Sequence, residues 1–368
     1  MERHIPIAKP VITGDELSAI GNVLNSGMLA QGRAVEEFER EFSGYIGAAN
    51  AIAVSNGTVA LDLALKAHGI GQGDEVITTP FTFIATANSV LYQGAKPVFA
   101  DVDEKTFNIR PEAVLEKITG KTKAVIGVHL FGHPFDVPAL EDICEDHDLF
   151  LIEDSAQAHS AEFRGKKAGS TGTGCFSFYP TKNITTGEGG MITSGSASVT
   201  EQCRLLRNHG QSSKYYHTVL GYNYRMTDIQ AAIGLVQLKS LEQFNRKRIR
   251  NAAFLSSHIR LDGLVLPSKE PDARHVYHQY VVTTQKGCID RDRFMKYLTA
   301  NGIGCAVHYP LPIYQQPLYR ELGYTNESAG CPVADGLAPR VLSLPVHPSL
   351  EPDDLQYIAD VINRYEEA

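Results

Sequence analysis

The chain has 368 residues, of which 43% are hydrophobic and 21% charged, so it can form one large globular domain and a smaller one. Its net charge of −8 argues against nonspecific binding to nucleic acid or to an anionic membrane, because both require a basic face. No stretch reaches the length of a membrane span and the N-terminus lacks the apolar core of a signal peptide, so we expect a cytoplasmic protein.

The cysteine pattern gives no sign of a disulfide framework or a metal site. The six cysteines are widely spaced, and no C-x-x-C pair occurs among Cys144, Cys175, Cys203, Cys288, Cys305 and Cys331. We therefore expect buried free thiols in a reducing compartment, and no bound metal.

Residues 13–240 alternate apolar, β-branched runs with helical patterns. This alternation predicts a large α/β domain built on a mostly parallel, mixed sheet. Helices are expected at residues 15–24, 35–45, 59–69 and 84–92. Strands are expected at residues 51–55, 74–79, 97–102, 124–131 and 149–154, and two apolar runs, 174–180 and 189–194, flank a central loop.

The pattern changes after about residue 240 and predicts a smaller α+β domain over residues 241–368. The charged helix expected at 237–258 is placed to bridge the two domains. Beyond it we expect strands at 275–284 and 303–309, an apolar run at 341–347, and helices at 292–302 and 351–368. The first twelve residues are extended and rich in proline, and we expect them to pack against the smaller domain.

Asp154 is the first residue that indicates chemistry. It ends the apolar run LFLIED, and in open α/β sheets the ligand site lies beyond the carboxyl ends of the strands. A buried carboxylate there must find a partner or raise its pKa. The alternative is an aspartate that caps a helix or lies in a turn, and Gln157 three residues later would suit a capping box.

Two loops add to this signal. In FSFYPTKNITTGEGGM, Lys182 stands between an aromatic strand end and a glycine-rich turn, where desolvation would lower its pKa and make it nucleophilic. In SNGT, residues 55–58 join a strand to a helix, and the free N–H groups of a helix N-terminus bind anions. A simple helix cap is the alternative for the second loop.

Taken in order, the segments SNGT, PFTFIATANSV, EDSAQAHSA, FSFYPTKNITTGEGG and GYNYRMTDIQAA resemble the DegT/DnrJ/EryC1/StrS family of sugar aminotransferases. The resemblance extends over nearly the whole chain, from SGMLAQG to HYPLPIYQQP. It implies the aspartate-aminotransferase fold (fold type I) with pyridoxal 5′-phosphate (PLP) as cofactor. The lysine segment and the Asp-x-x-Gln segment are its most specific parts.

The resemblance also implies a role for individual residues. Lys182 would be the Schiff-base lysine and the proton carrier, and Asp154 would pair with the pyridinium nitrogen of PLP, whose positive charge makes the ring an electron sink. Gln157 would contact the ring or its 3-oxygen, and Phe83 would stack on the ring unless it is simply a core residue. The residues expected at the phosphate are Gly57, Thr58, Ser177 and, from the neighbouring subunit of a homodimer, Asn223. Those expected at the sugar or nucleotide are Arg225, His308 and Tyr309.

The expected reaction transfers an amino group from L-glutamate to a nucleotide-linked keto sugar. The pattern H-Y-P-x-P favours a 3-keto over a 4-keto sugar, but Tyr314 stands where relatives that aminate C3 often carry histidine. A uronate substrate could pair with Arg225, unless this residue pairs with Asp228 instead. Serine at position 160, where glycine is usual, is a second departure. Dehydration, an aromatizing reaction and a non-enzymatic regulator are the alternatives. Lys182 favours transamination over dehydration, and Lys182, Asp154 and Gln157 together argue against a regulator.

Several other polar residues are expected to be structural. We assign His129 and His133 no catalytic role, and Glu188 has a place in the GEGG turn that conformation alone explains. The basic run of Arg246, Lys247, Arg248 and Arg250 is expected to form a solvated helix face.

Overall fold

A seven-stranded sheet forms the centre of the molecule, which a computed structural model describes over residues 3–366. Its strand order is β1-β9-β8-β5-β4-β2-β3, and β9 runs in the direction opposite to the other strands of this sheet. The strands are β1 (Asn50–Val54), β2 (Glu75–Thr78), β3 (Lys96–Phe99), β4 (Thr122–Val128), β5 (Phe150–Asp154), β8 (Thr173–Ser177) and β9 (Gly190–Ser194). The expected mostly parallel, mixed sheet is confirmed.

Both faces of this sheet are covered by helices, which is why its strands carry apolar residues on both faces. In β1, for example, Ile52 and Val54 face one hydrophobic core while Ala51 and Ala53 face the other. One face packs against α3 (Gly57–Ala67), α4 (Ala85–Tyr92) and α7 (Ala197–Arg207). The opposite face packs against α2 (Arg33–Ile46), α5 (Pro111–Leu115), α6 (Val137–Asp146) and part of α8 (Asp228–His258).

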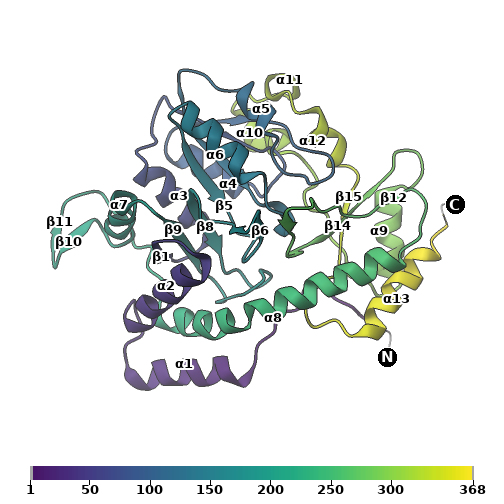
Figure 1. The fold of residues 1–368 in the computed structure, drawn as a ribbon, viewed down its shortest axis with the longest axis horizontal. Coiled ribbons are helices and arrows are strands. Elements are labelled where there is room, and N and C mark those ends of the chain that lie inside the picture. Colours follow the sequence, from purple (N-terminus) through teal and green to yellow (C-terminus); the bar gives the residue numbers. More distant parts are fainter. Residues whose placement is uncertain (1–2, 367–368) are drawn as a thin grey trace.

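Helix α8 runs from the central sheet to a second, separate core (Figure 1). It has 31 residues and begins well before the expected position 237, because Thr227 and Gln230 form a capping box at its start. The second core lies between α8 and the strands β12 (Leu264–Val265), β14 (Tyr280–Thr284) and β15 (Val341–Leu344) with the helices α9 (Arg291–Ala300) and α13 (Pro352–Asn363). Ile5 is part of this core, and its carbonyl accepts a hydrogen bond from Gly304 N at 2.8 Å.

The remaining elements are short or peripheral. Helix α1 (Gly14–Ser26) packs against α8, and the hairpin of β10 (Gln211–Ser213) and β11 (Tyr216–His217) projects from the body of the molecule (Figure 1). A small sheet joins β6 (Glu162–Phe163), β7 (Lys166–Lys167) and β13 (Ala273–Arg274). The others are α10 (Pro317–Glu321), α11 (Asn326–Ala329), α12 (Pro332–Leu337) and the 3₁₀ turns η1 (Leu130–Gly132) and η2 (Ile313–Gln315).

Two expected strands are wrong in whole or in part. Residues 303–309 form only single bridges, Ile303 with Ile5 and Ala306 with Ser343. The backbone groups of this stretch bond partly to the N-terminal segment and partly to β15, so no continuous strand forms. The strand expected at 275–284 begins only at Tyr280. The preceding residues donate hydrogen bonds to the turn after β4 instead, from Val276 N to Gly132 O at 2.9 Å and from Gln279 N to Phe131 O at 3.2 Å.

Two expectations about single side chains also need correction. Arg248 was expected on a solvated helix face but is only 5% exposed. Its guanidinium donates to the carbonyls of Tyr277 and His278 at 3.3 Å. Four cysteines are buried as expected, but Cys305 is half-buried and Cys288 lies exposed in a turn.

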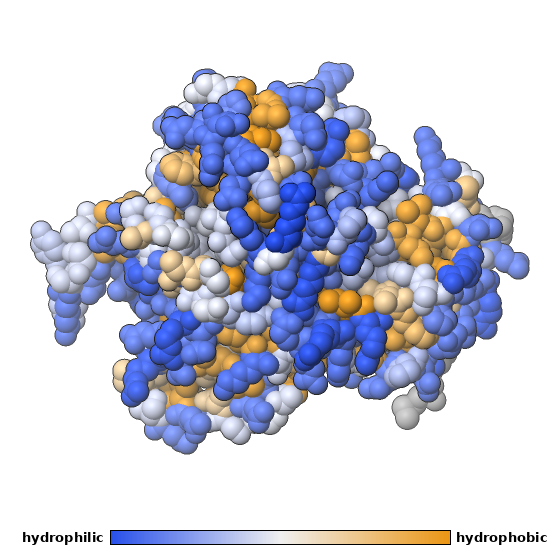
Figure 2. Space-filling view, viewed as in Figure 1, coloured by the Kyte–Doolittle hydropathy of each residue, from blue (hydrophilic) through white to orange (hydrophobic). Residues whose placement is uncertain are grey.

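The view in Figure 2 shows a mainly hydrophilic surface with scattered apolar patches. No helix within residues 3–366 is both long and apolar enough to cross a membrane.

Candidate active site

A cavity of about 650 Å³ opens at the carboxyl ends of β4 and β5, where the central sheet meets the segment before β14 and residues 308–309. This volume is in the range of small-molecule sites. Most residues expected at the site from the sequence line it: Gly57, Thr58, Phe83, Asp154, Gln157, Ser177, Lys182, His308 and Tyr309. Asn223 and Arg225 are not among the residues that line it.

Asp154 lies at the end of β5 and is 6% exposed. Its Oδ2 accepts a hydrogen bond from the Thr86 hydroxyl at 2.8 Å, and its Oδ1 accepts one from Ala156 N at 3.2 Å. Burial raises the pKa of Asp154, and the hydrogen bonds and the charge of Lys182 oppose that rise. No helix begins directly after Asp154, so the helix-cap alternative is wrong, whereas the bond from Ala156 N is the contact that a turn aspartate makes.

Gln157 connects two parts of the cavity wall. Its Oε1 accepts a hydrogen bond from Phe131 N at 2.8 Å, and its Nε2 donates to the Tyr309 hydroxyl at 3.0 Å. These contacts replace the capping-box bond that was the alternative for this residue. One N–H of the amide stays available to a ligand in the cavity.

Lys182 lies in a turn between β8 and β9 that several hydrogen bonds hold in place. Its backbone N–H donates to Tyr179 O at 2.9 Å, and the next residue, Asn183, donates from Nδ2 to Asn245 Oδ1 of α8 at 2.7 Å. Burial lowers the pKa of Lys182 to about 8, although the carboxylate of Asp154 works in the opposite direction. A larger fraction of this amine is therefore neutral and nucleophilic near physiological pH than in an exposed lysine.

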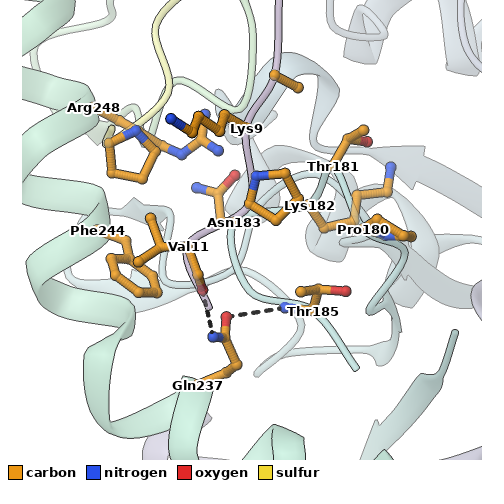
Figure 3. Close-up of a pocket in the computed structure, with 13 residues that line it drawn as sticks. Lys9, Val11, Pro180, Thr181, Lys182, Asn183, Thr185, Gln237, Phe244 and Arg248 are labelled. Carbon is orange, nitrogen blue, oxygen red and sulfur yellow. Dashed lines mark hydrogen bonds between the residues drawn. The ribbon is translucent and has the colours of Figure 1, made fainter. Parts of the chain in front are cut away.

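The back of the lysine turn is braced by α8 and the N-terminal segment, around a void with room for about one water molecule (Figure 3). Gln237 of α8 joins the two, because its Nε2 donates to Val11 O at 2.9 Å and its Oε1 accepts from Thr185 N at 3.4 Å. In Figure 3 the side chain of Lys182 extends away from Lys9 and Arg248, which lie on the other side of the void.

An anion cradle forms where β1 joins α3. Asn56 caps the helix, with its Oδ1 accepting from Val59 N at 2.9 Å, so the first N–H groups of α3 point past the strand end. A Cβ on Gly57 would lie 2.6 Å from the Cβ of Ser177, so only glycine permits this close approach. The free N–H groups, the hydroxyls of Thr58 and Ser177, and the positive end of the helix dipole fit a phosphate.

Aromatic and imidazole groups form the rest of the wall. The side chain of Phe83 is 57% exposed and lines the cavity, so the alternative of a core residue is wrong. Its ring centroid lies 6.4 Å from that of Tyr309. His308 is held by a contact of 2.8 Å between its Nδ1 and Ser343 Oγ, and the peptide bond between His308 and Tyr309 is cis.

Asn223 and Arg225 lie outside the cavity, on the chain segment that follows the β10–β11 hairpin. Asn223 is exposed, and Arg225 donates from Nη1 to Asn208 Oδ1. The alternative ion pair of Arg225 with Asp228 is absent, because the carboxylate of Asp228 accepts from Gly32 N and Val35 N instead.

The structure also locates Ser160 and Tyr314, the two residues that depart from the family pattern. Ser160 has φ +66°, a left-handed conformation that explains why glycine is usual there. Tyr314 is fully buried behind the cavity, where its hydroxyl donates to Asp335 Oδ1. Tyr314 therefore does not line the site and carries no direct information on the carbon that is aminated.

Several polar residues that line the cavity were not predicted as site residues from the sequence. Tyr179, Thr181 and Glu188 belong to the lysine turn, and others are Thr82, Thr86, His278 and Gln279. Thr86 lies in the first turn of α4 and Thr82 in the bend before it, so helix periodicity does not connect the two threonines. His278 and Gln279 belong to a segment that alternation assigned to a strand, and no signal in the sequence separates them from it.

Comparison with known proteins agrees with this geometry. The profile of the DegT/DnrJ/EryC1/StrS aminotransferase family matches residues 10–363. A pleiotropic regulatory protein of Geobacillus stearothermophilus is 41% identical over 95% of this chain and 94% of its own. UDP-N-acetyl-3-dehydro-alpha-D-glucosamine 3-aminotransferase of Acidithiobacillus ferrooxidans is 40% identical over 98% of this chain and 94% of its own.

A solved structure extends the similarity to three dimensions. The crystal structure of S. venezuelae DesV in complex with a ketimine intermediate matches with a TM-score of 0.92 and 36% identity, over 98% of each chain. The expected fold type I is thereby confirmed. The chain belongs to the DegT/DnrJ/EryC1/StrS aminotransferase family.

Proposed function

We propose that this chain is a PLP-dependent aminotransferase that transfers an amino group from L-glutamate to a nucleotide-linked keto sugar. The observation that carries the proposal is one cavity that holds a lysine of lowered pKa, a buried carboxylate and an anion cradle. Family membership supports the class of reaction and the cofactor. The relative of A. ferrooxidans, whose name specifies a UDP-linked 3-dehydro sugar, supports the class of substrate.

The residues fit PLP in the roles that the family pattern implies. Gly57, Thr58 and Ser177 would hold the phosphate, and Asp154 would hold a proton on the ring nitrogen. When bound, PLP supplies an electron sink for the carbanion that forms on the amino donor. Lys182 would remove the donor's α-proton and return a proton to the cofactor, as a base whose pKa of about 8 lies near the working pH.

The sugar would lie between Phe83, His308 and Tyr309, on the side of the cavity away from the anion cradle. Within the described part of one chain no arginine lines the cavity, so a phosphate or carboxylate of the substrate needs a cation from elsewhere. Arg225 of a second subunit is the residue we propose, and Asn223 would reach the cofactor phosphate by the same route.

A homodimer is the assembly that this proposal requires. Large apolar side chains are strongly exposed on α1 and the turn after it, and on the β10–β11 hairpin and the segment after it: Leu17, Leu24, Met28, Tyr215, Tyr216 and Leu220. Exposed apolar surface of this extent is typical of protein interfaces. The hairpin directly precedes Asn223 and Arg225, so an interface there would bring both residues to a partner's cavity.

Adding L-glutamate alone tests the reaction class. The PLP-loaded enzyme should release one equivalent of 2-oxoglutarate per subunit while the cofactor turns into its amine form, as followed by absorbance. Lys182→Ala should abolish this conversion, whereas Lys166→Ala, which changes an exposed lysine, should not. A dehydratase or a regulatory protein would give no 2-oxoglutarate, and this result from the unaltered enzyme would refute the proposal.

Mixed dimers test the shared site. Lys182→Ala and Asn223→Ala proteins should each be inactive alone, and mixing them should restore part of the activity, because one of the two composite sites is then intact. A fully active monomer in sedimentation would contradict the shared site.

Product analysis tests the position of amination. We favour a 3-keto sugar, and an assay with matched 3-keto and 4-keto nucleotide sugars, with the amine located by NMR, decides the point. Turnover of 4-keto sugars alone would overturn this preference and leave the class of enzyme unchanged.

A further inference from the structure

We propose that Thr86, supported by Thr82, is a positioning residue that sets the orientation and the acidity of Asp154. This inference rests on the proposed pairing of Asp154 with the ring nitrogen of PLP. It assigns a task to two threonines of the segment PFTFIATANSV that were given no role above.

The contacts define a chain of hydroxyl groups that ends on the carboxylate. Thr86 Oγ1 donates to Asp154 Oδ2 at 2.8 Å, and Thr82 Oγ1 lies 3.4 Å from Thr86 Oγ1. A hydroxyl has one proton to donate, and that of Thr86 is used on Asp154. The order of donation is therefore from Thr82 to Thr86 to Asp154.

Burial strengthens these hydrogen bonds. Thr86 is 1% exposed and Thr82 is 3% exposed, and both line the same cavity as Asp154. Asp154 itself is only 6% exposed, so few solvent contacts compete with these hydrogen bonds. A hydrogen bond to a charged group in such surroundings is stronger than one in water.

The carboxylate is held at both oxygens. Thr86 holds Oδ2 and the backbone N–H of Ala156 holds Oδ1, so the plane of the carboxyl group is fixed. Each oxygen keeps a lone pair for a further donor. Thr86 lies in the first turn of α4 and Thr82 just before that helix, whereas Asp154 ends β5, so the orientation of Asp154 depends on the packing of α4 against the sheet end.

The same hydrogen bond affects where a shared proton resides. A donor to the ionised carboxylate stabilises that form and lowers the pKa of Asp154, which opposes the rise caused by burial. A less basic Asp154 leaves the proton on the ring nitrogen. Without Thr86 the carboxyl group becomes more basic and draws the proton toward itself, which weakens the ring as an electron sink.

The variant that tests this is Thr86→Val, which removes the hydroxyl and keeps the branched shape. We expect kcat with glutamate to fall about tenfold, as for loss of one hydrogen bond to a charged group, with KM little changed. With PLP labelled with ¹⁵N in the ring, the nitrogen resonance should move toward that of the unprotonated form. Thr86→Ser should restore both, and Thr82→Val should give a smaller change in the same direction.

Thr78→Val is the matched control. Thr78 is also fully buried, in β2, and its hydroxyl donates to the neutral carbonyl of Ile126 at 3.0 Å, outside the cavity. Both valine variants lose one buried hydrogen bond, so a general effect of destabilisation should appear in both. Only Thr86→Val should move the nitrogen resonance.

The outcomes separate the positioning role from the proposed function. Wild-type kcat and an unchanged ¹⁵N resonance in Thr86→Val, alongside a defective Asp154→Asn enzyme, would overturn the role of Thr86 and leave that of Asp154 in place. Wild-type behaviour of Asp154→Asn as well would overturn the pairing of Asp154 with the ring. Equal changes in Thr86→Val and Thr78→Val would also reject the positioning role.

Discussion

Ser160 shows how one side chain can offset a strained backbone. Its φ of +66° disfavours any residue with a Cβ, but its hydroxyl donates to Glu242 Oε1 at 2.7 Å and accepts from Arg274 Nη1 at 2.9 Å. Burial alone would raise the pKa of Glu242, but its hydrogen bonds with Arg274, Tyr45 and Ser160 lower it to about 2. The sequence showed that position 160 departs from the family pattern, but it could not show the partners, which come from α8 and β13.

Two substitutions separate strain from hydrogen bonding at this position. Ser160→Ala keeps the strain and loses the hydroxyl, so we expect a loss of about 1–3 kcal/mol in the free energy of unfolding. Ser160→Gly loses the same bonds but removes strain of about 1 kcal/mol, so it should be the milder change. Urea unfolding of the apoenzyme measures both, and an alanine variant as stable as wild type would contradict this account.

At the scale of elements, the sequence predicted those whose stability is local and missed those set by contacts. Helices α2, α3 and α4 and the strands of the central sheet were found within a few residues, because their apolar residues recur at the spacing of a helix or form short buried runs. Helices α6 and α7 were not identified. The segments 275–279 and 303–309 contain strand-forming residues, but their backbone groups bond to η1, to the N-terminal segment and to Ser343, which no local pattern specifies.

The junction of β1 and α3 gives a prediction for a single element. In Gly57→Ala the added Cβ would meet Ser177 at 2.6 Å, so the helix start must move away from the strand end. We expect the dissociation constant for PLP to rise at least about tenfold, the equivalent of about 1.4 kcal/mol. Fluorescence titration of the apoenzyme with PLP measures it.

Gly44→Ala is the control for this change. Gly44 lies within α2, and a Cβ added there would meet no other atom within 4 Å. Alanine at this position should therefore stabilise the protein by up to about 1 kcal/mol and leave PLP binding unchanged. An unaltered affinity for PLP in Gly57→Ala would mean that the phosphate binds elsewhere.

At the scale of the whole molecule, buried neutral histidines determine the response to acid. Burial lowers the pKa of His133 and His347 to about 4 and that of His159 to about 3, and it holds the pKa of His275 and His278 well below the ordinary value. In the unfolded chain these groups bind protons near pH 6.5. The unfolded state therefore binds more protons than the folded state from about pH 6.5 down to about pH 4.

We accordingly expect the stability to fall as the pH is lowered through this window and to be nearly constant from pH 7 to 8. Each histidine contributes a slope of up to about 1.4 kcal/mol per pH unit. Thermal unfolding at a series of pH values measures the slope, which should be shallower in His347→Gln. A melting temperature that is the same at pH 7 and pH 5 would disagree with this expectation.

The division into a large domain ending at residue 240 and a smaller one after it stays a prediction. Composition suggests it, and the structure has two cores, but α8 passes through residue 240 without interruption and contributes side chains to both. A boundary inside a helix cannot be located from changes in sequence pattern, because the helical pattern continues across it.

The continuity of α8 limits how the protein can be divided for study. Its 31 residues correspond to a rod of roughly 46 Å, and cutting the gene at codon 240 would leave each fragment with a frayed half-helix and an uncovered apolar core. The same cut would separate Gln237 from Asn245, two of the side chains through which α8 holds the lysine turn. Neither fragment should be expressed as a stable product, and a minimal catalytic version of this enzyme must retain the whole rod.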